Sequence, residues 1–153
     1  MIVIYDPNGG FVTGGGWFMS PIVTGLQYMS VSGKANFGFV SKYKAGANTP
    51  TGETEFQFQE GNLNFHSSTY SWLVVSGCLA QYKGTGTING AGNYNFLLTA
   101  KDGAVNNCGA DGIRMKITNG SNVVYDNLTS ADDTMTSGNT QNLGGGSIVI
   151  HTK

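Results

Sequence analysis

The sequence predicts an all-β protein: an antiparallel β-sandwich, jelly-roll-like in shape, with about 10 to 11 strands and no significant helix. Three observations support this. Glycine takes 24 of the 153 positions, and most glycines separate short runs of alternating apolar and polar residues. That alternation has the period of a strand with one buried face. Residues that favour tight turns, mainly Gly, Asn, Asp and Pro, lie between the runs, and no window of about 11 residues carries an apolar stripe at helical spacing without a glycine.

The strand candidates follow one another at spacings of about 8–12 residues, and their short links indicate mostly antiparallel pairing. They cover residues 2–5, 11–19, 26–31, 35–43, 54–59, 63–67, 71–75, 80–88, 94–100, 113–118 with 123–125, and 147–151. Two stretches are expected to be loops. Residues 45–52 form a Pro- and Gly-bearing link, and residues 128–146 form either a mobile excursion or a ligand loop.

The alternation also predicts which side chains face the core. They are Phe37, Phe39, Phe56, Phe58, Leu63, Phe65, Trp72, Val74, Phe96, Leu98, Ile113, Met115, Ile117, Ile148 and Ile150. The run at 72–75 is apolar on both faces, as expected of a central strand covered on both sides. The glycine triplets at 14–16 and 144–146 are either a coincidence of composition or two points of close backbone approach.

Composition limits the class of protein. A length of 153 residues fits one domain, 1–153. Only 11% of residues are charged and the net charge is −1, so we expect no nucleic-acid partner. No apolar run reaches the roughly 18 residues of a membrane span. The N-terminus lacks the features of a signal peptide, which leaves a cytosolic protein or a module excised from a longer exported chain. The neutral, hydroxyl- and amide-rich composition favours the second, at an extracellular or cell-surface location.

The chain has two cysteines, Cys78 and Cys108, and neither has a CxxC partner or a nearby histidine. A thiolate metal site is therefore disfavoured. The pair forms either a disulfide or two ordinary buried thiols.

Residues for catalysis are poorly represented, and we expect no enzyme. His66 and His151 both lie within strand patterns, and no nucleophile elbow is present. Glu53 and Glu55 alternate outward on one strand, which is typical of a solvated face and not of paired carboxylates across a cleft.

Two kinds of binding site are candidates. Asp102, Asp111 and Asp126 fall at strand ends or in loops, where carboxylates and carbonyls can converge on a structural calcium ion, although the same residues also suit plain turns. No cofactor is otherwise required. Carbohydrate binding requires an exposed, roughly coplanar set of rings from Trp17, Tyr28, Tyr43, Tyr70 and Tyr82, although aromatic residues also pack well within sheets.

A string of motifs runs along nearly the whole chain. It comprises GFVTGGGW at 10–17, SP at 20–21, GKANFGF at 33–39, PTGETEFQF at 50–58, LNFHS at 63–67, WLVV at 72–75, GTGTING at 84–90, VYDN at 124–127 and LGGGSIVIH at 143–151. This string resembles a β-sandwich accessory module repeated in large exported prokaryotic surface proteins, near PKD-like and Ig-like repeats. The resemblance implies an extracellular module with no established activity and no catalytic residues.

These observations together predict a non-enzymatic extracellular module with a structural or adhesive role. Its partners would be neighbouring domains, identical subunits or polysaccharide. One alternative is a carbohydrate-binding module. The other is a filament or surface-layer subunit that assembles through uncovered edge strands at residues 2–5 or 147–151.

Overall fold

The computed structural model describes residues 10–43 and 49–151, which form ten strands and two short 3₁₀ helices. The strands are β1 (Phe11–Ser20), β2 (Gly33–Tyr43), β3 (Pro50–Phe58), β4 (Leu63–Ser76), β5 (Leu79–Ile88), β6 (Ala91–Lys101), β7 (Gly112–Asn119), β8 (Asn122–Asp126), β9 (Gln141–Asn142) and β10 (Gly145–His151). The 3₁₀ helices are η1 (Val105–Asn107) and η2 (Ser137–Asn139). The strand expected at 2–5 lies outside the described residues.

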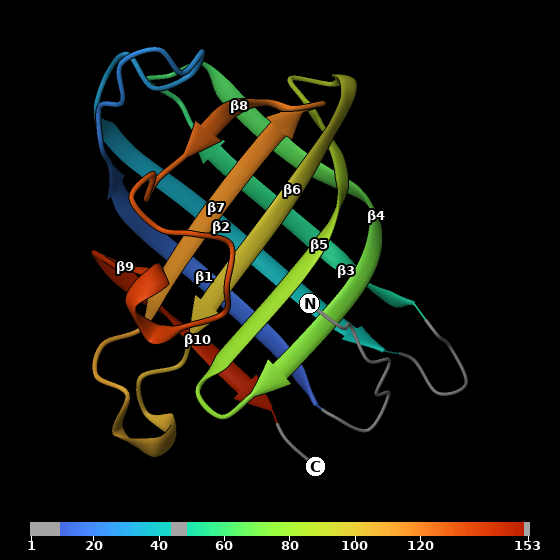
Figure 1. Cartoon of the computed structure of the whole chain (residues 1–153), viewed down its shortest axis with the longest axis vertical. Helices are drawn as coiled ribbons and strands as arrows, with labels where there is room; N and C mark the ends of the chain where they lie inside the picture. The colour runs from blue at the N-terminus through green and yellow to red at the C-terminus, as the bar shows by residue number, and fades with distance from the viewer. Residues whose placement is uncertain (1–9, 44–48, 152–153) are drawn as a thin grey trace.

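All the strands belong to one antiparallel sheet that folds over on itself. Its order is β10-β1-β2-β3-β4-β5-β6-β7-β8, and β9 pairs with β7. In Figure 1 the strands β4 to β8 cross in front of β1, β2, β3 and β10, which gives two layers. The prediction of an antiparallel, sandwich-like all-β fold is confirmed. Strands next to each other in sequence are also neighbours in the sheet from β1 to β8, so the connections are those of a meander, whereas a jelly roll is built from Greek keys.

The interior between the layers is mainly aromatic. Phe56 on β3 meets Tyr125 on β8 with ring centroids 4.8 Å apart, and Phe39 on β2 meets Tyr82 on β5 at 5.9 Å. These contacts join the two layers directly. Each fully buried ring of this size contributes roughly 1.5–3 kcal/mol to folding, so such rings dominate the stability of the sandwich.

Most of the predicted core residues are buried, but Trp72 and Val74 are not: both are only partly buried, and Leu73 between them is 3% exposed. The pairing with β5 explains this. Leu73 lies opposite Tyr82, which faces the interior, whereas Trp72 lies opposite Lys83, which faces outward. The prediction that Trp72 and Val74 point inward was therefore wrong.

Residues 63–67 and 71–75 were expected to be two strands, but they form the single strand β4. Its pairing with β5 shifts between Ser67 and Thr69 and again between Tyr70 and Trp72. Each shift is a bulge that adds one residue on β4 and reverses the alternation. Tyr70 lies between the two bulges and consequently turns toward the interior, where its ring centroid is 5.3 Å from that of Tyr82.

The strand expected at 26–31 is not formed, because this segment turns back on itself. Gly25 has a φ of 92°, and the Met29 amide donates to the Leu26 carbonyl at 3.2 Å. The Met29 side chain is fully buried, and its sulfur accepts a hydrogen bond from the Asp126 amide at 3.3 Å. The segment thus covers one end of the interior.

The two glycine triplets pair with each other at the β1–β10 contact. Gly16 lies opposite Gly146, and both have positive φ, 157° and 93°. A Cβ on Gly16 would overlap the carbonyl of Gly145, and a Cβ on Gly146 would overlap that of Gly15. The triplets are therefore points of close backbone approach. At the other end of the same strand pair, Phe11 lies opposite His151 and the two rings stack at 4.2 Å.

Candidate functional site

The segment that follows β8 lies against the outer face of β5, β6 and β7, and a buried arginine fixes it there. Arg114 projects outward from β7, yet its side chain is only 2% exposed. Its Nε and Nη2 donate to the two carboxylate oxygens of Asp126, at 3.1 and 2.7 Å. Its Nη1 donates to the Asp132 carbonyl at 2.6 Å and to Asp133 Oδ1 at 3.0 Å. One guanidinium thus joins the last residue of β8 to two residues of the segment that follows it.

The charge balance around Arg114 keeps it ionised. Burial alone would lower the pKa of its guanidinium, but the hydrogen bonds and charges of Asp126 and Asp133 outweigh burial, and the pKa is raised. A buried charge is tolerated only when it is paired and hydrogen-bonded. The Arg114 guanidinium can therefore stay buried only while Asp126 and Asp133 remain in contact with it.

Two more buried polar side chains lie beside the arginine. Gln81 on β5 and Thr99 on β6 are each 1% exposed although both face outward. The Gln81 side-chain amide donates to Thr99 Oγ1 at 3.1 Å and to the Asp133 carbonyl at 2.9 Å. We call Gln81, Thr99, Arg114 and Asp126 the outer polar layer. This layer is a second buried region, which lies on the outer face of the sheet and is held together by hydrogen bonds.

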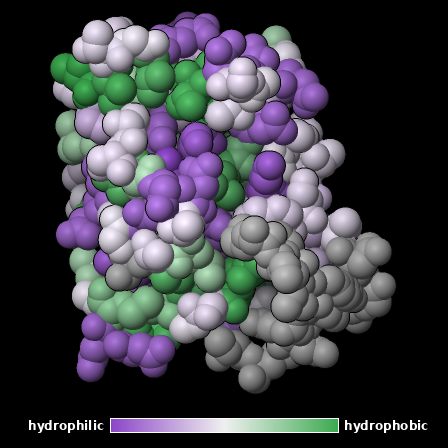
Figure 2. All heavy atoms as spheres, in the orientation of Figure 1, coloured by the Kyte–Doolittle hydropathy of each residue, from purple (hydrophilic) through white to green (hydrophobic). Residues whose placement is uncertain are grey.

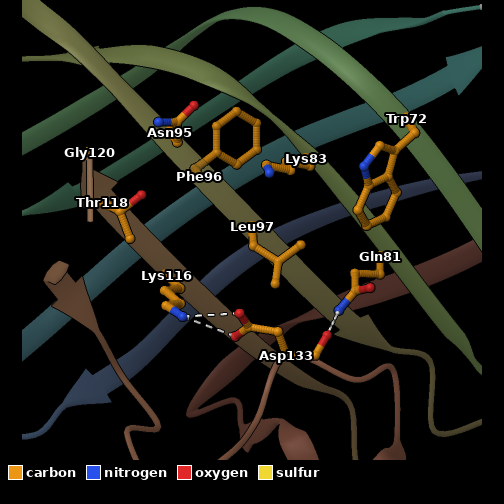
Figure 3. Close-up of a pocket in the computed structure, with 10 residues that line it drawn as sticks. All are labelled: Trp72, Gln81, Lys83, Asn95, Phe96, Leu97, Lys116, Thr118, Gly120 and Asp133. Atoms are coloured by element: carbon orange, nitrogen blue, oxygen red, sulfur yellow. Dashed lines mark hydrogen bonds and ion pairs between the residues drawn. The ribbon is translucent and has the colours of Figure 1, made fainter. Parts of the chain in front are cut away.

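An open groove of about 340 Å³, which we call the outer groove, adjoins this layer (Figure 3). It is lined by Trp72, Gln81, Lys83, Asn95, Phe96, Leu97, Lys116, Thr118, Gly120 and Asp133. Figure 2 shows this face of the molecule as a mixture of hydrophilic and hydrophobic residues. The volume is at the lower end of the range for small-molecule sites, about 300–1,000 Å³.

The register of the sheet explains how the groove is built. Trp72 lies opposite Lys83, Lys83 opposite Leu97, and Leu97 opposite Lys116. These four side chains therefore form one row across β4, β5, β6 and β7, on the outer face.

The flanks of this row are polar. Asn95 and Thr118, which lie opposite each other on β6 and β7, flank the row on one side. Gln81 and Asp133 flank it on the other side (Figure 3).

The two lysines of the row differ in their partners. Lys116 Nζ lies 3.1 Å from each carboxylate oxygen of Asp133. Partial burial alone would raise the pKa of Asp133, but Lys116 and Arg114 together hold it below the ordinary value. Lys83 is exposed and has no ion pair or hydrogen bond through its side chain within the described residues. Among the residues that the structure describes, the Lys83 ammonium is thus a positive charge of the groove without a partner.

The five predicted aromatic ligands do not form an exposed row. Tyr82 is completely buried, and its hydroxyl and that of Tyr70 both lie within 2.7 Å of Thr54 Oγ1. Burial raises the pKa of both tyrosines. The Tyr43 hydroxyl donates to the Leu73 carbonyl at 3.2 Å, and Tyr28 lies in the turn segment before β2.

Trp17, the fifth aromatic residue, is partly covered on the opposite layer. Lys34 Nζ lies 4.4 Å from the ring centroid, in a cation–π contact. A Cβ on Gly144 or Gly145 would meet the indole, so the ring packs closely over these glycines. The indole on the open groove is instead Trp72, which the sequence assigned to the core.

The three predicted calcium ligands have other hydrogen-bond partners. Asp102 Oδ2 accepts from the Ile150 amide at 2.9 Å, and Asp111 Oδ2 accepts from the Ile148 amide at 2.8 Å. Asp126 binds Arg114. We call the contact of Asp102 and Asp111 with β10 the carboxylate seam. Along the edge of β10, the carboxylate oxygens of these two residues accept the hydrogen bonds that a neighbouring strand would otherwise accept. In the described part of the chain no three His, Cys, Asp or Glu residues gather, and calcium binding stays a prediction.

Cys78 and Cys108 form a disulfide, with Cα atoms 6.4 Å apart. The bond joins the β4–β5 turn to the loop between β6 and β7, and this loop carries Asp102 and Asp111. Of the two alternatives left open by the sequence, the disulfide is the one observed.

The histidines lie apart from the groove. His66 Nε2 is 3.6 Å from Glu55 Oε1, and both side chains are more than half exposed. His151 Nε2 lies 3.2 Å from Thr13 Oγ1, at the end of the β1–β10 pair.

No protein-family model matches the chain, and no curated protein or solved structure is significantly similar to it. The resemblance to modules of exported prokaryotic proteins therefore stays a prediction. Within residues 10–43 and 49–151, no helix has the length and apolar character needed to cross a membrane.

Proposed function

We propose that this chain is a non-enzymatic extracellular module that serves a structural or adhesive role in a secreted or cell-surface protein. The observation that carries the proposal is the Cys78–Cys108 disulfide. Disulfides persist in oxidising compartments outside the cytosol. By the loop-entropy estimate, a bridge that closes a loop of this length contributes about 3–4 kcal/mol, a large share of the stability of an ordinary domain.

An adhesive contact is best supported at the outer groove. One wall is fixed by the buried Arg114, and the floor and the other wall come from adjacent strands, so the shape is set before any partner arrives. Preorganised surfaces lose less conformational entropy on binding than mobile ones. The groove also combines an indole ring with ammonium, amide and hydroxyl groups, which suits a polar partner.

Assembly by strand addition is less well supported at β10. Free amides at a sheet edge are what a neighbouring chain would pair with, but the Ile148 and Ile150 amides already donate to Asp111 and Asp102. The other predicted edge, at residues 2–5, lies outside the described residues.

The proposal is tested in cells that produce the protein. Intact cells and culture medium are treated with a membrane-impermeant amine label, and the protein is denatured and alkylated without reduction. We expect labelled protein whose two cysteines resist alkylation until a reductant is added. Unlabelled protein inside the cells with two free thiols would contradict the proposal.

Adhesion is measured separately. Beads coated with the purified chain are washed over the cell envelopes or matrix of the same cells, and retention is compared with beads coated with the Trp72→Ala variant. We expect the variant to lose retention. Equal retention of both kinds of bead would remove the groove from the proposed role.

A further inference from the structure

We infer that the outer groove binds an acidic saccharide, with a hexuronate unit placed between Trp72 and Lys83. This inference rests on the proposed function and names the ligand class of the same groove. Three properties of the groove carry it: its charge, the chemistry of its row of side chains, and its dimensions.

The charge of the groove favours one anionic group. Arg114 and Lys116 are neutralised by Asp126 and Asp133, and Lys83 remains as an exposed ammonium without a partner in the described chain. A single carboxylate would form a charge-assisted hydrogen bond with Lys83. A nucleic acid presents a phosphate at every nucleotide and needs several cations in line, whereas the groove offers one and the whole chain has a net charge of −1.

The row of side chains favours a sugar ring. Trp72 and Lys83 are directly opposite each other, so their side chains are neighbours on the outer face of the sheet. An indole ring packs against the apolar face of a pyranose, and this arrangement leaves the carboxylate at the ring edge within reach of Lys83. Asn95 and Thr118 supply an amide and a hydroxyl that can both donate and accept hydrogen bonds with sugar hydroxyls.

The dimensions favour a short oligosaccharide. From Trp72 to Lys116 the row spans three interstrand steps, or roughly 14 Å at about 4.8 Å per step. The volume of about 340 Å³ limits the occupant to a few sugar units. Lys116 lies at the far end of the row, where its ammonium is shared with Asp133.

The test uses the two tryptophans of the chain as separate reporters. The intact, oxidised, ¹⁵N-labelled protein gives two indole N–H resonances, which the Trp72→Phe variant assigns. The ligands are trimers of galacturonate, mannuronate and glucuronate, each compared with its neutral hexose trimer. We expect at least one acidic trimer to shift the Trp72 resonance saturably, with the Trp17 resonance unmoved and the neutral counterpart much weaker.

Two substitutions locate the contacts. Lys83→Gln should weaken binding of the acidic trimer about tenfold, since it removes one charge-assisted hydrogen bond, and should leave the neutral trimer unaffected. Lys42→Gln is the matched control, because Lys42 is an exposed lysine on β2 in the other layer. Trp72→Ala should abolish binding, and Trp72→Phe, which keeps an aromatic face, should retain part of it.

Several results would overturn the inference. They are an unmoved Trp72 resonance with all three acidic trimers, equal affinity for acidic and neutral trimers, an unchanged affinity in Lys83→Gln, or tighter binding of a single-stranded oligothymidylate. None of these bears on the surface labelling or the state of the cysteines, so the inference can fail while the extracellular assignment stands.

Discussion

The interior and the outer polar layer lie on opposite sides of the same strands and are buried by different chemistry. On β7, Ile113 and Met115 face the interior and are fully buried, while Arg114 between them faces outward and is almost as buried. The interior is held mainly by apolar contacts, which depend chiefly on volume and alternation, with a few hydrogen bonds such as that of Tyr82 with Thr54. The outer layer depends on each hydrogen bond being made, because an unpaired buried charge is costly. Side chains in this molecule are therefore buried in two ways, by apolar packing and by hydrogen bonding, and each can be perturbed separately.

The largest expected effect comes from the interior. Phe56→Ala removes a ring that contacts Phe18 and Tyr125 and should lower the free energy of unfolding by about 3–5 kcal/mol. The loss should be global, with tryptophan fluorescence and circular dichroism giving the same urea midpoint. Val149→Ala, at a position that is 41% exposed, is the control and should change stability by no more than about 0.5 kcal/mol. A loss below about 1 kcal/mol for Phe56→Ala would show that the interior is not the main source of stability.

The next largest effect is expected from the disulfide, which holds the loop that carries the carboxylate seam. The double variant Cys78→Ser with Cys108→Ser should lose about 3–4 kcal/mol. Hydrogen exchange at the Ile148 and Ile150 amides should accelerate more than at interior strands, because the bond restrains the loop that carries their acceptors. Reductant should have no further effect on the double variant. Uniform acceleration throughout the sheet would contradict a local link.

Arg114→Met breaks the outer layer and leaves the interior intact. It leaves the Asp126 carboxylate buried without its partner, and we expect a loss of about 3 kcal/mol, at the lower end of the cost of a broken buried ion pair, because Asp133 is half exposed. Exchange of amides at residues 128–134 should rise first. Adding Asp126→Leu to this variant should restore much of the stability, since no unpaired charge then remains. If the double variant is less stable than the single one, the ion pair is not the reason for the loss.

The smallest effect is expected from acid. The pKa of Asp133 is lowered, so its contribution is complete above the ordinary carboxyl value of 3.8 and disappears as the pH falls through the lower folded-state value. Because this side chain is 52% exposed, the contribution is no more than about 1 kcal/mol. Hydrogen exchange of the amides at 128–134, corrected for the intrinsic pH dependence, reports how fast this segment opens. In the wild type the opening should be faster than at neutral pH only when the pH is below about 4. Asp133→Asn should remove this dependence, and its persistence in that variant would assign it to another carboxyl group.

The sequence predicted the interior well because alternation is a local property. Phe37, Phe56 and Ile113 follow simple period-two patterns, and all three are buried as expected. Trp72 was misassigned because its direction depends on its pairing with Lys83, which the alternation within β4 does not reveal. The marker of the bulges lies on the partner strand, where Gly84 and Gly86 leave room for the β4 backbone. The meander order likewise results from the folding of the whole sheet.

The outer polar layer had only a weak signal in the sequence. Arg114 reads as an exposed residue between two buried ones, and its partner Asp133 lies 19 positions away, in a stretch expected to be either a mobile excursion or a ligand loop. The one available hint was the length of that stretch, since compact domains rarely hold a long loop without anchoring it. The outer groove was also missed, because its row of side chains comes from four strands that are brought together only by the pairing of the sheet.

The pairing of Phe11 with His151 determines how the molecule would respond to mechanical tension. These residues are partners at the same end of the antiparallel β1–β10 pair. A pulling force applied through them would open the hydrogen bonds of that pair one after another, in unzipping geometry, and would not load them all together in shear. The Cys78–Cys108 bridge lies outside the strands that would separate first. If this chain is held between two anchoring points, it would yield first at β10 and extend in small steps, while the crosslinked strands remain folded.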